Sequence, residues 1–435
     1  MRPAPPIGVV VVHYGADELT MRCLRALEQD HRSPPTQVVL VENGPGTAFA
    51  QRVRSELPEV LVVGAGVNLG FAAGCNLGLT ALRHVDLIAL VNSDVRVTSG
   101  WLLPLAAALE REPALGAASP KILFDGAFHT LHIQASDSTR PGWGDRRSVA
   151  WRLRRVWLGS EDVTGRCQLV SGFWEPDGVG SWAGPLVELR VPAGTSGALR
   201  IDMDVPVSGQ TLVVQPGGQV VQPPAMSSTI QELVLPGEAQ RVINNVGSEW
   251  RSDGYGVDRG FQEIDAGQHD RPQDVPAWCG GAVLLRRSYL DESEGFDERL
   301  FLYYEDLELA IRGAALGWRY RLEPASVVEH RHAASFATDP AGITARRERN
   351  RLLVLLRHGR RRQVVAALVS FTLVTGSYLR RDVIAPVVRG RRPVWAIVAS
   401  RVSALTGAIL LAPAMIRSRR RDRRVQREHH TWPDC

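Results

Sequence analysis

The sequence predicts an α/β protein built on a doubly wound, mostly parallel sheet, with an inserted all-β sandwich and a C-terminal helical tail. Apolar strand-like runs alternate with amphipathic helical stretches near the N-terminus, short alternating runs between Gly- and Pro-rich turns fill the middle, and arginine-flanked apolar stretches close the chain. A chain of 435 residues is long enough for two or three domains. We expect four parts: two halves of one α/β domain at 1–130 and 242–350, the sandwich at 131–241, and the tail at 351–435.

The N-terminal part alternates strands with helices. The strand-like runs are Ile7–Val12, Gln37–Val41, Leu61–Val63 and Leu87–Val91, and helical stretches between them are Leu19–Gln29 and Gly74–Arg83. This order predicts parallel strands joined by right-handed crossovers. In such sheets, ligands bind outside the carboxyl ends of the strands.

Polar residues follow each of these strands at that edge. They are His13 and Tyr14, then Glu42 and Asn43, then Asn68 and Gly70, and finally Asn92, Ser93 and Asp94. An acid-bearing turn after a strand can hold Mg²⁺ or Mn²⁺ against phosphates, because these ions prefer oxygen ligands. The alternative is a plain strand-to-helix turn in which Asp94 serves as a cap. The turn after the first strand is not the Gly-x-Gly-x-x-Gly turn of a dehydrogenase.

The middle of the chain has the pattern of a β-sandwich. Residues 171–237 are rich in Gly, Pro, Val and Gln, and carry short alternating runs bounded by turn residues. The tryptophans of this region could stack on sugars, although such side chains more often belong to the core; they are Trp151, Trp157, Trp174 and Trp182. The α/β character returns near Val242, so we interpret the sandwich as an insertion.

A carboxylate pair, Glu305 and Asp306, lies at the start of a helical pattern, directly after the aromatic run Phe301, Tyr303 and Tyr304. Burial beside aromatic rings raises the basicity of a carboxylate, so the pair could take a proton from an incoming hydroxyl. The alternative is that both acids simply suit the positive end of a helix dipole.

Six separated segments together resemble the pattern of family 2 inverting glycosyltransferases with the GT-A fold, particularly the bacterial rhamnosyltransferase-like and galactofuranosyltransferase-like branch. The segments are Val9–Tyr14, Val39–Gly44, Asn68–Gly78, Val91–Asp94, Trp278–Ala282 and Gly295–Gly317. Each is a weak signal alone, whereas the ordered set is specific. The resemblance covers roughly residues 7–130 and 242–350.

The resemblance implies a role for each matching residue. Asp306 is expected to be the general base and Glu305 to orient the acceptor. The expected donor-binding residues are His13, Tyr14, Glu42, Asn43, Asn68, Gly70, Asn76, Asn92 and Ser93. The expected acceptor-binding residues are Trp278, Gly280, Gly281 and Tyr304.

A divalent ion, Mg²⁺ or Mn²⁺, is implied as cofactor, held by Asp94 and a histidine downstream of the base. His330 is preferred over His332 because it directly follows an apolar strand-like segment. The first acid of the family's Asp-x-Asp metal motif is replaced by Asn92, a weaker ligand.

The basic charge of the chain is concentrated in its tail. From Ala341 onward there are 21 arginines, no lysine and five acids, about +16, so the rest of the chain carries about −11 of the net +5. The arginines flank two apolar stretches, Gln363–Leu379 and Pro393–Ile416, both at or below the length that spans a bilayer. We expect a monotopic amphipathic hairpin on an anionic membrane surface, not a nucleic-acid site. Two helices packed on the catalytic domain and a true spanning pair are the alternatives.

These expectations describe a metal-assisted transferase that moves a sugar from a dTDP- or UDP-linked donor to a cell-envelope glycan or lipid-linked acceptor. No secretory signal is visible and the five cysteines are scattered, which favours the cytoplasmic face of the membrane. A nucleotidyltransferase would need a Gly-rich, basic phosphate loop that Ile7–Gly15 lacks. A non-catalytic carbohydrate-binding scaffold with a degenerate transferase domain also stays open, and Asn92 is its best support.

Overall fold

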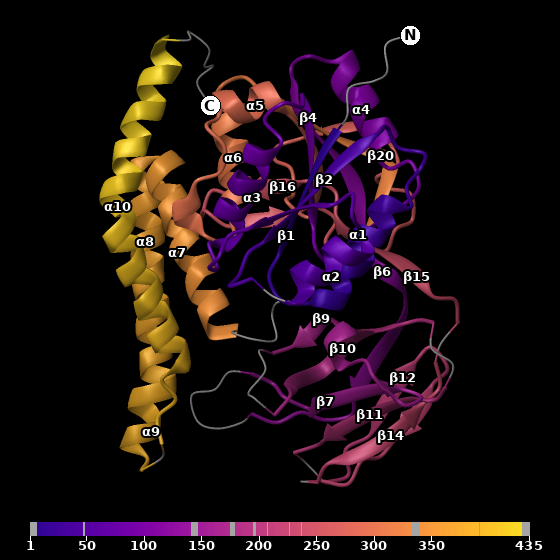
Figure 1. Cartoon of the computed structure of the whole chain (residues 1–435). Coiled ribbons are helices and arrows are strands. Elements are labelled where there is room, and N and C mark those ends of the chain that lie inside the picture. The colour runs from indigo at the N-terminus through magenta and orange to yellow at the C-terminus, as the bar shows by residue number, and fades with distance from the viewer. Residues whose placement is uncertain are drawn as a thin grey trace. The chain divides into compact units, whose positions relative to one another are not determined.

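The computed structural model describes residues 7–46, 48–140, 147–174, 179–194, 197–206, 208–225, 227–235, 237–331, 340–390 and 392–428. The chain divides into two compact units, one formed by Met1–Asp125 with Ile243–Cys435 and the other by Gly126–Val242 (Figure 1). The expected sandwich, 131–241, lies within the second unit. The expected tail belongs to the first.

The first unit begins with alternating strands and helices. Its first half contains β1 (Ile7–His13), α1 (Asp17–Glu28), β2 (Thr36–Glu42), α2 (Ala48–Glu56), β3 (Leu61–Gly64), α3 (Gly70–Ala81), β4 (Leu87–Asn92), β5 (Val95–Val97), α4 (Leu102–Arg111) and β6 (Leu115–Ala135), which continues into the second unit. Its second half contains β15 (Gln240–Asn245), β16 (Ser248–Trp250), β17 (Gly256–Asp258), β18 (Gln273–Val275), β19 (Ala282–Arg286), α5 (Arg287–Glu292), η2 (Glu298–Leu300), α6 (Glu305–Ala314), β20 (Arg319–His330) and α7 (Pro340–His358).

The main sheet of the first unit runs in the order β3, β2, β1, β4, β19, β6, β20 and β18. The first four strands are parallel, as expected from the strand–helix alternation. β19 is antiparallel to both β4 and β6, so a strand from the second half of the unit lies between two strands from the first half. The predicted α/β fold class is confirmed, with a mixed sheet.

Alternate side chains of β1 lie on opposite faces of this sheet. Val9 and Val11 join a core with α1, α2 and α4, whereas Val10 and Val12 join a core with α3, α5 and α6. Strand side chains alternate between faces, and all seven residues of β1 are buried. The sheet is therefore covered by helices on both sides, which explains why its strands are continuous apolar runs.

The glycines of α3 let this helix lie close to the sheet. A Cβ at Gly74 would come within 2.8 Å of Val12, and a Cβ at Gly78 within 2.4 Å of Val10. Both glycines lie on the same helix face because they are four residues apart. Part of the motif Asn68–Gly78 is thus explained by packing.

The second unit is all β and is described separately. Its elements are the end of β6, β7 (Trp151–Leu158), β8 (Glu161–Asp162), η1 (Thr164–Arg166), β9 (Gln168–Phe173), β10 (Ser181–Pro192), β11 (Leu199–Asp204), β12 (Leu212–Gln215), β13 (Gln219–Val221) and β14 (Thr229–Leu233). The start of β10 pairs with β7 and its end pairs with β6, so one long strand joins two groups of strands around a single apolar core. Trp151 lies fully inside this core, whereas Trp157 and Trp182 each stack against an arginine.

The tail consists of long helices. They are α8 (Arg361–Tyr378), the π-helical turn η3 (Leu379–Ile384), α9 (Ala385–Val388) and α10 (Ala396–Glu428). The helical stretches Arg361–Val388 and Ala396–Arg424 are long and apolar enough to cross a membrane by length and composition. They exceed the apolar runs expected from sequence because the helices extend through the flanking arginines.

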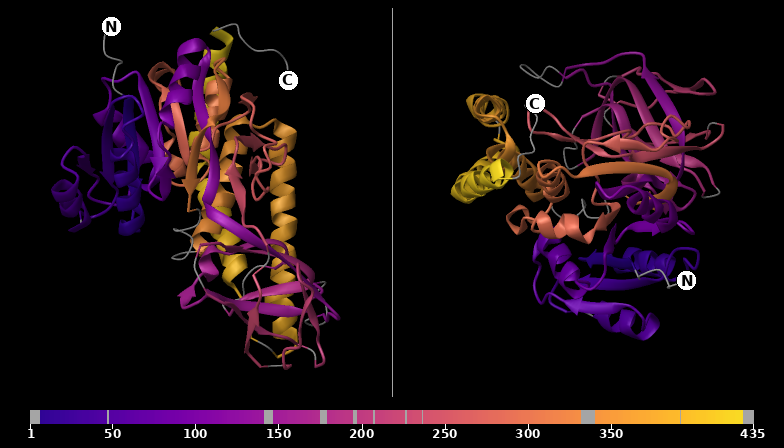
Figure 2. Two further views of the ribbon diagram at one scale, coloured as in Figure 1. Left: turned by 90° about the vertical axis from the view of Figure 1, so that its right-hand side faces the viewer. Right: turned by 90° about the horizontal axis from the view of Figure 1, so that it is seen from above.

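One face of α10 packs along α7, which is visible in two further views (Figure 2). Ala404, Ala408 and Met415 are buried in a shared core with Leu352–Leu355 of α7. The opposite face exposes Val402, Ile409, Leu410 and Ile416. The tail therefore contacts the catalytic unit with one side and presents apolar side chains on the other.

Candidate active site

The carboxyl ends of the parallel strands bring the first site residues into one row. His13 is opposite Glu42 in the β1–β2 pair, Glu42 is opposite Gly64, and Asn92 is opposite Val12. Because the strands are in register, residues expected to bind the donor meet at one edge of the sheet. Within this row, Asn92 is half-buried, whereas His13 and Glu42 are buried.

His13 and Asn43 support this edge from behind. His13 Nδ1 lies 2.8 Å from Thr20 Oγ1, and burial lowers the pKa of this imidazole despite the nearby Asp17. Asn43 donates to the Gly70 carbonyl at 3.1 Å and accepts from the Leu69 amide at 2.9 Å. Both side chains are thus engaged within the protein and position the turns around them, and their contact with the donor stays a prediction.

The turn before α3 joins the donor edge to the segment that carries the carboxylate pair. Asn68 is exposed, and its Oδ1 accepts from the Gly70 amide at 2.9 Å. Gly70 has φ +81°, and a Cβ there would lie 2.5 Å from the Phe301 carbonyl oxygen, which itself accepts from the Ala72 amide at 3.2 Å. Only glycine fits at this contact.

Gly280 and Gly281 connect the strand edge to the base. The Asn92 amide donates to the Gly281 carbonyl at 2.9 Å, and the Gly280 amide donates to Asp306 Oδ2 at 2.8 Å. A Cβ at Gly280 would crowd that carboxylate at 3.3 Å. Asp306 is therefore linked to the end of β4 through the backbone of Gly280 and Gly281.

Burial raises the pKa of both members of the carboxylate pair. For Glu305, burial and the charge of Asp306 raise the pKa to about 8, and its Oε2 has no hydrogen-bond partner among the described residues. For Asp306, burial raises the pKa, while hydrogen bonds from the Gly280 and Leu307 amides oppose that shift. At neutral pH, Glu305 is largely protonated.

Asp94 and His330 form the second cluster. Their Oδ1 and Nε2 atoms are 3.0 Å apart, and His330 Nδ1 lies 3.0 Å from Asn244 Oδ1. Burial lowers the pKa of His330, but the charge of Asp94 outweighs it and leaves the pKa raised. The other histidine considered, His332, lies outside the described residues.

The donor atoms of this cluster fit a divalent ion that is also bound by a substrate. Across the described ranges, no three His, Cys, Asp or Glu side chains are grouped in a way that could hold a metal. Asn92 adds an amide oxygen, Oδ1, that is buried and has no hydrogen-bond partner in the part of the chain that the structure describes. One carboxylate, one imidazole and an amide oxygen suit an ion that completes its shell with phosphate oxygens.

A strained loop leads into the pair. Phe301, Tyr303 and Tyr304 have φ of 66°, 70° and 72°, a conformation that costs non-glycine residues on the order of 1 kcal/mol each. Asn350 of α7 is fully buried, and the two N–H groups of its Nδ2 are shared among the carbonyls of Leu300, Leu302 and Tyr303 at 2.7–3.0 Å. Helix α7 therefore maintains the loop in this conformation.

Two predicted contacts are corrected by the structure. Trp278 is fully buried and its Nε1 donates to the Tyr289 hydroxyl at 3.1 Å, so its ring lies in the core and not on an acceptor surface. Asn76 connects α3 to the loop at Phe296. Its side-chain amide donates to the Phe296 carbonyl and accepts from the Phe296 amide, both at 3.0 Å. Asn76 thus positions the loop and does not face the strand edge.

The remaining predicted residues lie in the first unit. Tyr14 is exposed, Ser93 is half-buried beside Asp94, and the Tyr304 hydroxyl accepts from the Gly256 amide at 3.3 Å.

Asp258 is a site residue that the sequence did not reveal. Its carboxylate accepts hydrogen bonds from Asn245 at 2.7 Å and Ser248 at 3.2 Å, and its charge raises the pKa of both Asp306 and His330. It lies on the short strand β17, whose residues are exposed. Asp258 is therefore a third carboxylate close to the base, and it can accept hydrogen bonds from hydroxyl groups. A Gly-x-Asp-x-Gly stretch without helix or strand periodicity gave no signal for it.

Residues 8–155 match the family described as glycosyl transferase family 2. The chain contains a family 2 glycosyltransferase domain. This agrees with the fold and with the motifs that the strand edge and α6 bring together. The matched segment includes the strand ends that carry Glu42 and Asp94.

Curated relatives support the same assignment for part of the domain. The chain is 37% identical over 86 residues to N-acetylglucosaminyl-diphospho-decaprenol L-rhamnosyltransferase of Mycobacterium tuberculosis, in the strains CDC 1551 / Oshkosh and ATCC 25618 / H37Rv. The match covers 19% of this chain and 28% of the relative.

Two solved glycosyltransferases are distantly similar. One is GalNAc-T7 with UDP, GalNAc and Mn²⁺, with a TM-score of 0.43 and 11% identity over 82% of this chain and 48% of the other. The second is the mannosyltransferase PcManGT of Pyrobaculum calidifontis with GDP-Man and Mn²⁺, with a TM-score of 0.38 and 14% identity over 96% of this chain and 81% of the other. These TM-scores are low, and the family is identified from the sequence match.

Proposed function

We propose that the chain is an inverting glycosyltransferase that moves a sugar from a dTDP- or UDP-linked donor to a cell-envelope glycan or lipid-linked acceptor, with Asp306 as the general base. The observation that supports this best is the short path from the end of β4 to the base. The Asn92 amide binds the Gly281 carbonyl, and the adjacent Gly280 amide binds Asp306. A base this close to the donor edge is suited to deprotonate a hydroxyl that attacks a sugar held there.

Asp306 and Glu305 have different tasks in this proposal. Asp306 removes the acceptor proton while the hydroxyl attacks the sugar C1 from the face opposite the nucleotide, so that one displacement inverts the configuration. Its raised pKa makes it a stronger base than an ordinary aspartate. Glu305, protonated at neutral pH, donates a hydrogen bond that orients the acceptor.

The donor is bound at the strand edge. Glu42 accepts from the imide N–H of uracil or thymine, and the exposed Asn68 lies where the diphosphate approaches the N-terminus of α3. Asp94 and His330 would hold Mg²⁺ or Mn²⁺, with Asn92 as a neutral neighbour. When bound, this ion supplies positive charge to the diphosphate leaving group.

The tail is proposed to attach the enzyme to the cytoplasmic face of a membrane. Only 11% of the apolar window is buried in the first candidate span and 22% in the second, so these are not ordinary core helices. The middle of α10 nevertheless packs on α7, which carries Arg346, Arg347 and Arg349. A helix that keeps this contact lies along the membrane surface, because spanning would carry the charged α7 into hydrocarbon.

The acceptor class is inferred from the curated relatives, whose names specify a lipid-linked N-acetylglucosaminyl diphosphate acceptor and a rhamnosyl product. We therefore expect transfer from dTDP-rhamnose, among a panel of dTDP- and UDP-sugars, to N-acetylglucosaminyl-diphospho-polyprenol.

The decisive test is Asp306→Asn in the full-length protein. Transfer should fall at least a thousandfold in kcat, while calorimetric binding of the nucleotide changes little, since the amide keeps the size of the carboxylate but cannot take a proton. Asp291→Asn, an exposed change on α5, is the matched control and should behave like the wild type. If Asp306→Asn retained a tenth of the wild-type kcat, Asp306 would not be the base. Glycan binding without any nucleotide binding would instead favour the scaffold alternative.

A further inference from the structure

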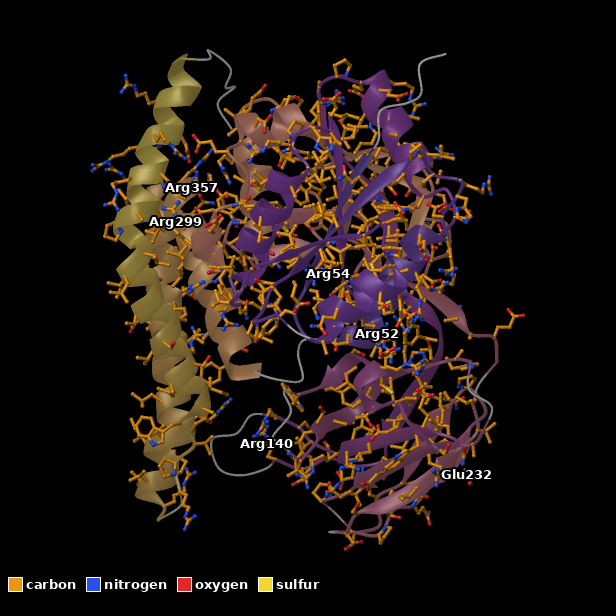
Figure 3. All side chains as sticks on the ribbon, in the orientation of Figure 1. Arg52, Arg54, Arg140, Glu232, Arg299 and Arg357 are labelled. Atoms are coloured by element: carbon orange, nitrogen blue, oxygen red, sulfur yellow. The ribbon has the colours of Figure 1, made fainter. Side chains whose placement is uncertain are left out.

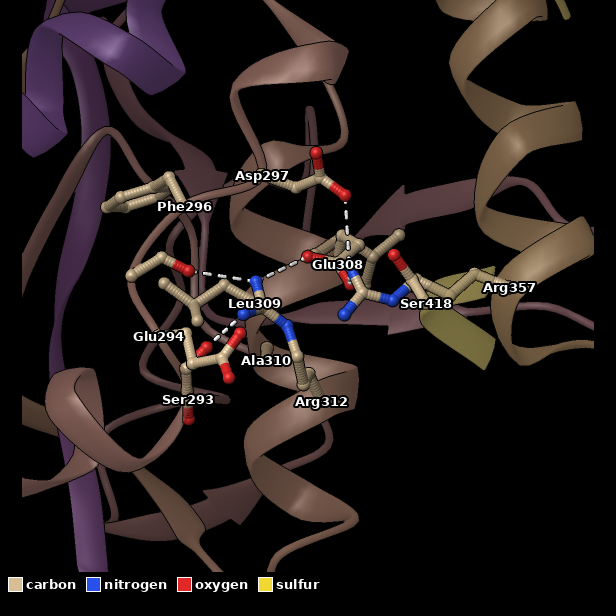
Figure 4. Close-up of polar contacts among 12 residues, drawn as sticks. Ser293, Glu294, Phe296, Asp297, Glu308, Leu309, Ala310, Arg312, Arg357 and Ser418 are labelled. Carbon is tan, nitrogen blue, oxygen red and sulfur yellow. Dashed lines mark hydrogen bonds and ion pairs between the residues drawn. The ribbon is translucent and has the colours of Figure 1, made fainter. Parts of the chain in front are cut away.

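The end of α7 carries a buried arginine whose partners come from three different parts of the first unit. The Arg357 side chain is 1% exposed, and its Nη1 lies 2.9 Å from Asp297 Oδ2 and 2.9 Å from Glu308 Oε1. Its Nε and Nη2 bind both oxygens of Asp422 on α10, at 2.8 and 3.2 Å. Figure 4 shows Arg357 facing Asp297 and Glu308, and Figure 3 labels its position beside Arg299.

Two of these partners bracket the carboxylate pair. Asp297 precedes the strained loop, and Glu308 follows Asp306 by two residues on α6. One guanidinium therefore holds both ends of the segment that contains the base. The planar, forked donor set of arginine is suited to such a multiple contact.

Glu308 is anchored firmly in its charged form. Burial would raise its pKa, but Arg312, His358 and Arg357 together hold the pKa of this carboxyl well below its usual range. Arg312 lies 2.7 Å from Glu308 Oε2, and His358 Nε2 lies 2.9 Å from Oε1. A fully buried carboxylate with fixed partners resists displacement, so a movement of Arg357 is transmitted to α6.

The tail supplies the third partner and a second contact. Asp422 orients the guanidinium from α10, and Ser418, one turn earlier, accepts from Arg299 at 2.9 Å. Arg299 in turn is bound to Asp297. Both contacts from α10 thus converge on the residue that precedes the strained loop.

We propose that Arg357 is a positioning residue for Asp306, and that Asp422 orients it, so that the base reaches its working position only while α10 is seated on α7. The proposal rests on the role of Asp306 given above. It makes the tail a structural part of the catalytic site as well as an anchor. Seating of α10 at a membrane surface would then favour the active arrangement.

The test compares Asp422→Asn with Asp382→Asn in the full-length protein. Asp382 is a tail aspartate bound to the neighbouring Arg381, which makes it a matched control without contact to the base segment. The first readout is amide hydrogen exchange over residues 297–308, which requires no activity. We expect exchange there to be at least fivefold faster in Asp422→Asn, with Asp382→Asn and the conservative Asp422→Glu close to the wild type.

The second readout compares the effect of the substitution on kcat with its effect on the donor KM. Asp422→Asn should lower kcat about tenfold and leave the donor KM nearly unchanged, because the donor edge is untouched and only the base is displaced. Unchanged exchange over 297–308 would overturn the proposal, and so would faster exchange spread evenly through the first unit. If the wild type itself transferred no sugar, the proposed function would fail while the exchange result still decided the coupling.

Discussion

At the scale of single residues, the site is a set of carboxylates with different environments. Glu305 is buried without a partner for one oxygen, Asp306 is held by two backbone amides, and Asp94 lies against an imidazole. Burial raises the pKa of Glu305 to about 8, whereas for Asp306 the two amide hydrogen bonds oppose the rise in pKa that burial causes. Such divergence is typical of sites in which one group donates and another accepts a proton.

The first prediction concerns Glu305 and pH. Its folded pKa, about 8, exceeds the ordinary value of 4.5, so the folded state binds the proton more tightly than the unfolded state. The wild type should lose stability as pH rises from about 4.5 to about 8, by up to roughly 5 kcal/mol. Glu305→Gln should remove most of this loss in urea denaturation at pH 5, 7 and 9. Glu110→Gln, an exposed change on α4, should keep the wild-type dependence of stability on pH. If both variants showed the same dependence on pH, Glu305 would not be a buried, protonated carboxyl group.

The second prediction concerns Asp94. Asp94→Asn should weaken the Mn²⁺-dependent binding of UDP or dTDP at least tenfold in calorimetry, since it removes the charged oxygen ligand. Without Mn²⁺, the variant and the wild type should bind equally. Asp86→Asn, exposed on the other end of β4, serves as the control. A metal-dependent affinity that survives in Asp94→Asn would exclude this residue as a ligand.

Part of this site could be predicted because strand ends are visible in sequence. The β-branched runs before His13, Glu42 and Asn92 locate the sheet edge, and the motif order locates Asp306. Trp278 was misassigned because its position next to two site glycines does not reveal which way its ring points. Asp258 was missed because its contacts to Asn245 and its proximity to His330 depend on tertiary structure.

At the scale of elements, α7 stabilises the loop that precedes the carboxylate pair. The Asn350 amide nitrogen binds the carbonyls of Leu302 and Tyr303 in the loop and also lies 2.8 Å from the Leu300 carbonyl. The role of Asn350 depends on a loop about fifty residues upstream, which no local pattern of α7 reveals. The same limit applies to β19, since no local pattern reveals that it lies between β4 and β6.

The third prediction tests this contact. Asn350→Ala should lower the free energy of unfolding by about 2 kcal/mol, because the carbonyls of Leu302 and Tyr303 lose the side-chain donor that Asn350 provides. It should also lower kcat, because the loop that precedes Asp306 relaxes. Gln363→Ala removes two exposed hydrogen bonds, one to the Ser252 carbonyl and one from the Arg360 amide, and should cost about 1 kcal/mol or less. Similar losses in the two variants would argue against a special role of Asn350.

At the scale of the whole molecule, charge and exposed apolar surface both gather toward the C-terminus. The segment from Ala341 onward carries about +16, and the exposed face of α10 presents apolar side chains, a combination that supports the proposed attachment to an anionic membrane. In that proposal, the packed face of α10 links the domain to the membrane surface.

The fourth prediction concerns membrane binding. The full chain should co-sediment with vesicles that contain phosphatidylglycerol, and less so with increasing salt, because the arginines are screened. Ile409→Asn combined with Leu410→Asn should reduce binding at least fivefold by removing apolar contact. Leu186→Asn, an equally exposed leucine in the second unit, is the control. Equal binding of both variants would place the contact elsewhere.

The insertion of β19 between β4 and β6 has a consequence for synthesis on the ribosome. When residues up to 125 have emerged, β4 and the part of β6 that pairs with β19 are both made, but β19 itself is still more than 150 residues away. The second unit, Gly126–Val242, is continuous in sequence and can fold in the meantime. Nascent chains stalled before Ala282 should therefore hold a folded all-β unit beside an incomplete, protease-sensitive sheet. Chaperones would encounter this domain in that half-built state during every round of translation.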